Sequence, residues 1–272
     1  EYDILIEHIY DYAAALGLDI DTVIQEGGAA QLEINLRHGD PLELADQVFL
    51  FKRLIREAAL RCGSYATFMA KPMEDQPGSA MHIHQSVIET ATGRSLFATG
   101  TGAPTEAFEH FIGGLQAHLR AACCLMAPYV NSYRRLVPHL TAPINLDWGR
   151  DNRTTGLRVP IAEPDATRVE NRVVGADANP YLAIAATLAC GYLGMVDGLR
   201  PRTEVTTDSY DRPRELPYGL LDAVAEFKRA PRLQSVLGEG FSSLYAAVKE
   251  KEYDEFMRVI SPWEREHLLL NV

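Results

Sequence analysis

Three short segments with a two-residue alternation carry the side chains best suited to chemistry. They are Gln31–Arg37, Met81–Val87 and Arg168–Val174. In a strand, residues two apart share a face, so each segment predicts one apolar face and one polar face. The polar faces would carry Glu33, Asn35, Arg37, His82, His84, Ser86, Arg168, Glu170 and Arg172. Acids, imidazoles and guanidiniums dominate this set and lysine is absent from it, which favours ligand binding over a merely solvated face.

These residue types suit a cation beside an anionic substrate. Carboxylates with a histidine bind divalent cations such as Mg²⁺ or Mn²⁺, and arginine holds phosphate or carboxylate with two parallel hydrogen bonds. Phosphoryl transfer needs this combination, because its catalysis is positioning plus charge stabilisation. Further arginines follow between residues 131 and 160, namely Arg134, Arg135, Arg150, Arg153 and Arg158. The alternative is an antiparallel sheet whose second face is simply solvated.

The composition excludes several classes of protein. The 272 residues include 26 Lys and Arg against 37 Asp and Glu, a net charge of −11, so the surface is a poor general binder of nucleic acid or anionic membrane. The four cysteines, Cys62, Cys123, Cys124 and Cys190, have no zinc-site or CxxC spacing, which indicates reduced thiols and a cytoplasmic location. The P-loop, dinucleotide-binding, zinc-protease and nucleophile-elbow motifs do not occur.

Two stretches could be mistaken for targeting or membrane segments. The acidic N-terminal stretch lacks the basic region and cleavage site of a signal peptide. Pro180–Val196 is uncharged, but it is short for a membrane span and rich in Ala and Gly. Asn179 and Pro180 suit the start of a helix, so we expect a buried core helix there.

The remaining pattern predicts the elements that must position the polar faces. Helices are expected at Tyr2–Leu16, Asp40–Arg61, Thr105–Met126 and Pro180–Val196, with further helices between Leu220 and Leu270. Strands are expected at Gln31–Arg37, Ala66–Ala70, Met81–Val87, Thr154–Val159 and Arg168–Val174. Because helices and strands come in runs, the sequence predicts an α+β fold of one domain, with a largely antiparallel sheet flanked by helices.

The same polar faces lie in motifs that resemble the glutamine synthetase family. The matching stretches are AQLEINLRHGDPLELADQVFLFK, ATFMAKPMEDQPGSAMHIHQS, NSYRRLVPHLTAPINLDWGRDNRTTGLRVP, RVENRVVGADANPYLAIAATLACGYLG and SPWEREHLLL. The resemblance spans nearly the whole chain, and its KP…GSxMHxHxS and NRxxxxRxP motifs are highly specific. It implies a curved, largely antiparallel catalytic sheet of the kind that guanidino kinases share. It also implies that residues 1–272 are a catalytic domain without the family's N-terminal β-grasp domain and first catalytic strand.

The resemblance implies an ATP-dependent ligase that uses two or more Mg²⁺ or Mn²⁺ ions. In the family, the γ-carboxylate of glutamate is phosphorylated and an amine then attacks the acyl phosphate. The resemblance implies metal ligands at Glu26, Glu33, His82 and Glu170. It implies an ATP site at His84, Ser86 and Arg168, and contacts to the transferred phosphate from Arg153 and Arg158. It also implies a glutamate site at Gly78, Arg135 and Arg172. Gln25 remains an alternative to Glu26. We expect Glu33, His82 and Glu170 to converge in space.

Two departures from the family pattern concern the substrates. Thr141 stands where the family has a loop glutamate that deprotonates ammonium, and Pro77 stands where the family has a glutamate-binding asparagine. We therefore expect a γ-glutamyl ligase for a larger amine, such as a polyamine or ethanolamine, with Thr141 at the substrate site. Two alternatives stay open: a non-catalytic relative with a structural or regulatory role, and a guanidino-kinase-like phosphotransferase.

The missing N-terminal part carries expectations of its own. The family's rings share sites between neighbouring subunits, so the parent protein is expected to be a homo-oligomeric ring. Alone, residues 1–272 would retain two protein ligands for each cation, so we expect weak metal binding and little ligase activity from them.

Overall fold

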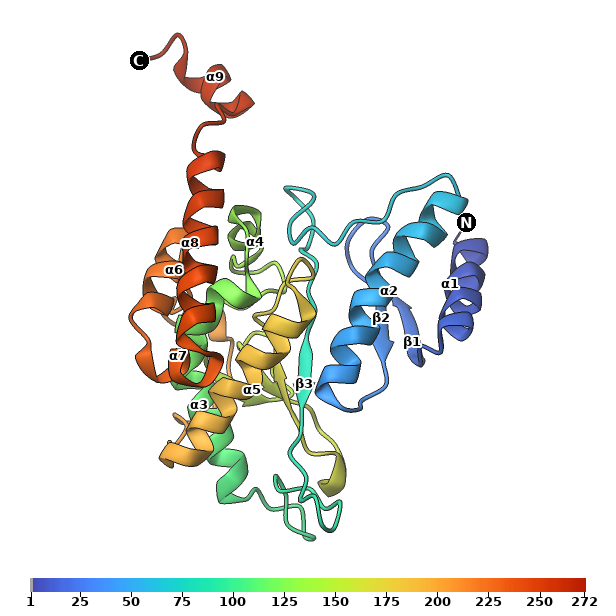
Figure 1. The fold of residues 1–272 in the computed structure, drawn as a ribbon, viewed down its shortest axis with the longest axis vertical. Coiled ribbons are helices and arrows are strands. Elements are labelled where there is room, and N and C mark those ends of the chain that lie inside the picture. Colours follow the sequence, from blue (N-terminus) through green and yellow to red (C-terminus); the bar gives the residue numbers. More distant parts are fainter. Residues whose placement is uncertain (1) are drawn as a thin grey trace.

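The computed structural model describes residues 2–272 and shows an α+β fold in which helices flank a small mixed sheet (Figure 1). The helices are α1 (Asp3–Leu16), α2 (Pro41–Arg61), α3 (Glu106–Met126), α4 (Val130–Arg135), α5 (Pro180–Asp197), α6 (Leu220–Lys228), α7 (Pro231–Leu237), α8 (Glu239–Phe256) and α9 (Pro262–Leu268), with short 3-10 turns η1 (Pro164–Ala166) and η2 (Ser209–Asp211). The strands are β1 (Ile20–Gln25), β2 (Leu32–Leu36), β3 (Ile83–Gln85), β4 (Trp148–Arg150), β5 (Leu157–Val159) and β6 (Val169–Asn171). The predicted fold class is confirmed.

The central sheet has the strand order β3-β6-β5-β4, and it is antiparallel except where β4 pairs with β5. Its register places both His84 and Arg158 beside Glu170. The alternating apolar residues Leu157, Val159 and Val169 are buried in the main core, together with residues of α3 and α5. The alternation therefore turns the polar side chains of β3, β5 and β6 away from that core.

Helices α3 and α5 pack closely, because glycines line their contact (Figure 1). The N-cap side chain of Asn179 accepts from the Leu182 amide, and Pro180 occupies the first turn. By length and composition α5 could cross a membrane, but half of it is buried inside the protein. The prediction of a core helix at this position is confirmed.

Gly194 is the tightest point of this contact, so Gly194→Ala is expected to destabilise the protein by about 1–3 kcal/mol or more. A Cβ atom there would lie 2.1 Å from the His110 carbonyl oxygen and 2.5 Å from Gly114 Cα. Urea unfolding measures the loss. The matched control is Gly240→Ala in α8, where a Cβ meets no atom within 4 Å, and it should be neutral or stabilising. Equal effects of the two substitutions would contradict the packing described.

A second, smaller core joins α1, α2 and the β1–β2 hairpin. In Figure 1 these elements lie together on the far side of β3 from the C-terminal helices. Two contacts tie α2 to the start of α5: Lys52 Nζ donates to the Ala178 carbonyl at 2.7 Å, and the Tyr181 hydroxyl donates to Asp46. The hairpin is thus held beside the main sheet.

Burial lowers the pKa of Lys52 to about 8, with Asp177 partly opposing the shift. Between about pH 8 and the ordinary value of 10.5, the unfolded chain binds more protons at this site than the folded chain. The contribution of Lys52 to the free energy of unfolding therefore rises with pH in that window. Lys52→Met removes this dependence, so the stability of the variant relative to wild type should fall from pH 8 upward. Urea unfolding along a pH series tests this, and a constant difference would contradict it.

Several predicted strands are shorter than the sequence indicated, and one is absent. Ala66–Ala70 is irregular, because the Ala70 carbonyl accepts from Ser79 and the next residue, Lys71, exchanges backbone hydrogen bonds with the Asn131 side chain. The strands expected at Gln31–Arg37, Met81–Val87, Thr154–Val159 and Arg168–Val174 narrow to β2, β3, β5 and β6. The elements β1, α4 and β4 were not predicted.

Candidate active site

Glu170, in the middle of β6, is the centre of the polar face. The residue as a whole is 2% exposed. Oε1 accepts from Arg172 Nη1 at 2.7 Å and lies 3.1 Å from His82 Nδ1, while Oε2 accepts from Arg158 Nη1 at 2.8 Å. Three predicted site residues therefore meet at one buried carboxylate. The alternation and register of β3, β5 and β6 bring them there.

The charges in this cluster are strongly coupled. Burial opposes ionisation of Glu170, but the hydrogen bond from His82 and the charge of Arg172 outweigh it and hold the pKa of Glu170 well below its usual range. Burial lowers the pKa of His82 to about 4, so its imidazole is neutral near pH 7. A neutral ring that donates Nδ1–H to Glu170 keeps the Nε2 lone pair available for a cation.

Arg158 bridges two carboxylates on the same face. Besides its bond to Glu170, its Nε donates to Asp151 Oδ1 at 3.0 Å and its Nη2 contacts the same oxygen. Burial works against the charge, but the bonds to Asp151 and Glu170 raise the pKa of Arg158 above its ordinary value. Asp151 was missed at the sequence level, although it lies inside the WGRDNR stretch.

The predicted nucleotide residues occupy the outer part of this face. Arg168 Nε donates to His84 Nδ1 at 3.3 Å, and burial lowers the pKa of His84. Ser86 is exposed and directly follows β3, and Arg153 is exposed on the turn between β4 and β5. The structure brings Arg168 and His84 into contact, and it leaves Ser86 and Arg153 on the surface.

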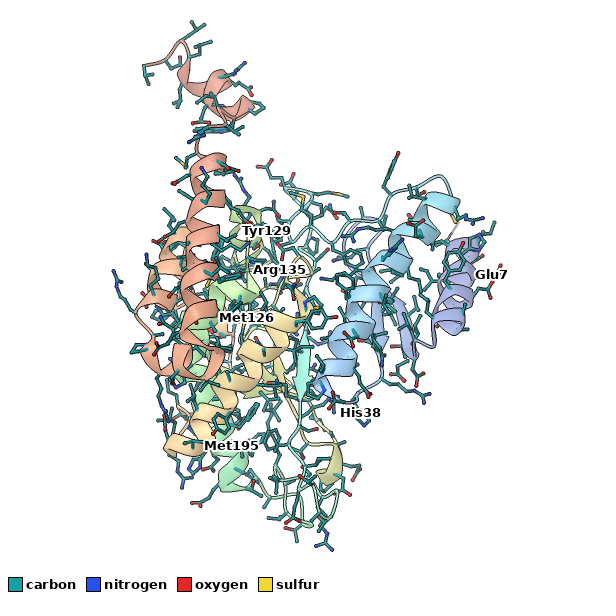
Figure 2. All side chains as sticks on the ribbon, in the orientation of Figure 1. Glu7, His38, Met126, Tyr129, Arg135 and Met195 are labelled. Carbon is teal, nitrogen blue, oxygen red and sulfur yellow. The ribbon has the colours of Figure 1, made fainter. Side chains whose placement is uncertain are left out.

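Arg135 and Gly78 lie behind the polar face. Arg135 is buried in the interior of the main body (Figure 2), and burial lowers its pKa to about 10. Both terminal nitrogens donate to backbone, Nη1 to the Val173 carbonyl and Nη2 to the Arg172 carbonyl, each at 2.9 Å. A Cβ on Gly78 would lie 2.6 Å from Arg135 Cγ. Arg135 therefore supports the backbone that follows β6, and the absence of a side chain at Gly78 lets Arg135 pack closely against it.

Glu26 and Glu33 lie on the β1–β2 hairpin, which forms a separate two-stranded sheet. Gln31 Nε2 donates to the Gly78 carbonyl at 3.1 Å, which ties the hairpin to the loop before β3. Glu33 Oε1 accepts from Asn35 within β2, and Glu26 is exposed. Within residues 2–272, no group of three His, Cys, Asp or Glu side chains is placed to hold a metal ion. The three predicted ligands Glu33, His82 and Glu170 therefore do not form one such group, and their service of two neighbouring cations stays a prediction.

Thr141 lies on a loop that contacts the polar face through its backbone. The Thr141 carbonyl accepts from Arg172 Nη2 at 3.3 Å. Thr141 and His139 both have positive φ, 65° and 63°, a conformation that is costly for residues with a Cβ and is typical of functional loops. The backbone, and not the threonine side chain, makes the contact.

A helix-covered sheet whose polar face gathers a buried carboxylate, two imidazoles and three arginines has the chemistry of an anion-binding site. A sequence profile described as "Glutamine synthetase, catalytic domain" matches residues 1–268. The chain belongs to the glutamine synthetase family.

Individual relatives support the assignment. The chain is 38% identical over 254 residues to "Gamma-glutamylputrescine synthetase PuuA" of Escherichia coli (strain K12), covering 92% of this chain and 53% of that protein. It is 36% identical to "Glutamine synthetase" of Thermococcus kodakarensis, covering 92% and 58%, and 34% identical to "Glutamate--isopropylamine ligase" of a Pseudomonas species, covering 96% and 58%. The chain therefore spans little more than half the length of these relatives.

Solved structures agree with this comparison. The structure titled "Apo GmaS without ligand" superposes with a TM-score of 0.88 at 32% identity, covering 99% of this chain and 63% of that one. A second, titled "GmaS/ADP complex-Conformation 1", gives the same TM-score and identity and covers 64% of that chain. The predicted family and catalytic-domain type are confirmed.

Proposed function

We propose that the chain is the catalytic domain of an ATP-dependent ligase that joins the γ-carboxylate of glutamate to an amine through a γ-glutamyl phosphate. The observation that carries this proposal is the buried Glu170 carboxylate with Arg158, Arg172 and His82 around it. Two guanidiniums held in place by one buried carboxylate are preorganised to bind anionic groups, Arg158 the phosphoryl group in transfer and Arg172 the substrate carboxylate. Relatives named for ligation of putrescine and isopropylamine support the same chemistry.

The roles within the site follow the chemistry of each group. Arg158, with Arg153 on the neighbouring turn, neutralises the transferred phosphate. Arg172 holds substrate carboxylate beside the loop of Thr141, while Gly78 and Arg135 shape the glutamate pocket. His84, Ser86 and Arg168 contact the nucleotide.

Divalent cations fit this donor set only in part. His82 Nε2 and the Glu170 carboxylate suit Mg²⁺ or Mn²⁺, with Glu26 and Glu33 as the proposed ligands of a second ion. Residues 2–272 do not assemble three such donors at one point. When bound, the cations would lower the charge of the nucleotide phosphates.

The amine is proposed to be larger than ammonia. The loop between Pro138 and Pro143 holds no carboxylate, so it cannot attract an ammonium ion by charge, and a polyamine or ethanolamine is the expected class. The proposed setting is a cytoplasmic homo-oligomeric ring whose subunits contain this domain.

ATP hydrolysis by the full-length protein tests the proposal. It should require glutamate and an amine together, and putrescine should support a higher kcat/KM than ammonium. A clear preference for ammonium would contradict the amine assignment. ATP turnover that ignores glutamate would contradict the ligase assignment.

A further inference from the structure

Tyr210 is held rigidly beside the site by a buried polar network that the proposed chemistry does not use. Its neighbour Ser209 is fully buried, and the Ser209 hydroxyl donates to Asn145 Oδ1 at 2.9 Å and to Asp147 Oδ2 at 3.1 Å. Asn145 Nδ2 donates back to the Ser209 carbonyl at 2.8 Å. Arg212 Nε donates to Asp147 at 2.7 Å. The short turn η2 is therefore fastened to the segment that leads into β4.

From this anchor, Tyr210 reaches the loop between Pro138 and Pro143. Its hydroxyl donates to the Ala142 carbonyl at 3.1 Å. Its ring meets the His139 ring edge-on, with centroids 5.0 Å apart and planes at 61°, a favourable aromatic geometry. In the same loop, the Thr141 carbonyl accepts from Arg172 Nη2. Tyr210 on one side and Arg172 on the other thus fix a loop whose backbone is strained at His139 and Thr141.

The loop between Pro138 and Pro143 and the Tyr210 ring differ in charge from the rest of the site. Glutamate and ATP are anions, and both are drawn to the arginines around Glu170. Between Pro138 and Pro143 the loop carries no acid, lysine or arginine. It presents an imidazole and a methyl-bearing threonine, and Tyr210 adds a phenol ring. Aromatic faces suit an ammonium group or the methylenes beside it, so the amine is the substrate that fits this side.

We propose that Tyr210 and His139 form the wall that selects the amine, with Tyr210 as the positioning residue that sets the loop. The inference rests on the proposed function and names a substrate class for it: primary amines with an alkyl body of several methylenes. A rigid aromatic wall gains apolar contact with each added methylene, whereas ammonia has no methylene and gains none of that contact. The wall acts on amine binding and has no part in forming the acyl phosphate.

The experiment compares Tyr210→Phe, Tyr210→Ala and His139→Ala in the full-length protein with ammonium, methylamine, propylamine and putrescine. Tyr210→Phe removes only the hydroxyl bond to Ala142 and should raise KM for the alkylamines about threefold to tenfold. Each alanine variant should lower the kcat/KM ratio of propylamine to ammonium about tenfold or more. The KM values for glutamate and for ATP should not change.

Tyr192→Ala is the matched control, since Tyr192 is an exposed aromatic residue on α5, and it should leave the amine ratio at the wild-type value. Thermal unfolding confirms that each variant is folded. An unchanged propylamine-to-ammonium ratio in both alanine variants, while ligation persists, would overturn the wall and leave the ligase assignment standing. If the wild-type protein shows no ligation with any amine, the proposed function itself fails.

Discussion

Glu170→Gln is expected to reduce ligation strongly and to destabilise the protein by about 3–5 kcal/mol. The buried carboxylate accepts hydrogen bonds from Arg158, Arg172 and His82 at once. A glutamine has nearly the same shape but carries no charge and only one acceptor oxygen, so the buried Arg172 guanidinium loses its carboxylate partner and Arg158 keeps only Asp151. Activity should fall by about a hundredfold or more, because both arginines lose the geometry that positions them.

Urea unfolding and steady-state ligation in the full-length protein measure the two effects. The control is Glu250→Gln. Glu250 lies on α8 and forms an exposed ion pair with Lys228 of α6, which the substitution removes. Exposed ion pairs contribute about 0–1 kcal/mol, so the control should stay close to wild type in both assays. A Glu170→Gln variant as stable and active as the Glu250→Gln variant would show that the cluster is neither a structural centre nor the active site.

Arg158→Lys is expected to reduce kcat by about a hundredfold while leaving the fold intact. The guanidinium of Arg158 reaches Asp151 through Nε and Glu170 through Nη1 at the same time. A lysine keeps the positive charge but has a single ammonium group, so it cannot span both carboxylates with fixed geometry. The loss should appear mainly in kcat, because the proposed role is in phosphoryl transfer.

Arg200→Lys provides a control with the same pattern of partners. Arg200 also bridges two carboxylates, Glu106 and Glu109, but on the exposed surface near the start of α3. Its replacement should change neither kcat nor stability by a measurable amount. A kcat for Arg158→Lys that matches the control would place the transferred phosphate elsewhere.

The sequence predicted the polar face because strand periodicity is local. Alternation alone puts His82 and His84 on one face of β3, and Arg168, Glu170 and Arg172 on one face of β6. It could not say that β3 and β6 are neighbours, which the register of His84 with Glu170 now shows. The family resemblance supplied that expectation.

Other features depend on contacts that no local pattern encodes. Tyr210 lies far along the chain from His139, and both their ring contact and the buried Ser209 network that anchors Tyr210 need the folded chain. Ala66–Ala70 alternates like a strand, yet its backbone finds partners in a loop and in the Asn131 side chain. Whether Glu33 and His82 serve neighbouring cations stays a prediction, because β2 belongs to a separate two-stranded sheet and its alternation says nothing of its place beside β3.

The most direct test of the ligase assignment follows one oxygen atom. When an amine attacks a γ-glutamyl phosphate, the bond between the carbonyl carbon and the bridging oxygen breaks, and that oxygen leaves with the phosphate. The full-length protein, given ATP, putrescine and glutamate labelled with heavy oxygen in its γ-carboxylate, should release inorganic phosphate that carries one labelled oxygen for each amide formed. Mass spectrometry of the phosphate reads this out. Amide formation with unlabelled phosphate, or phosphate release without amide, would contradict the assignment.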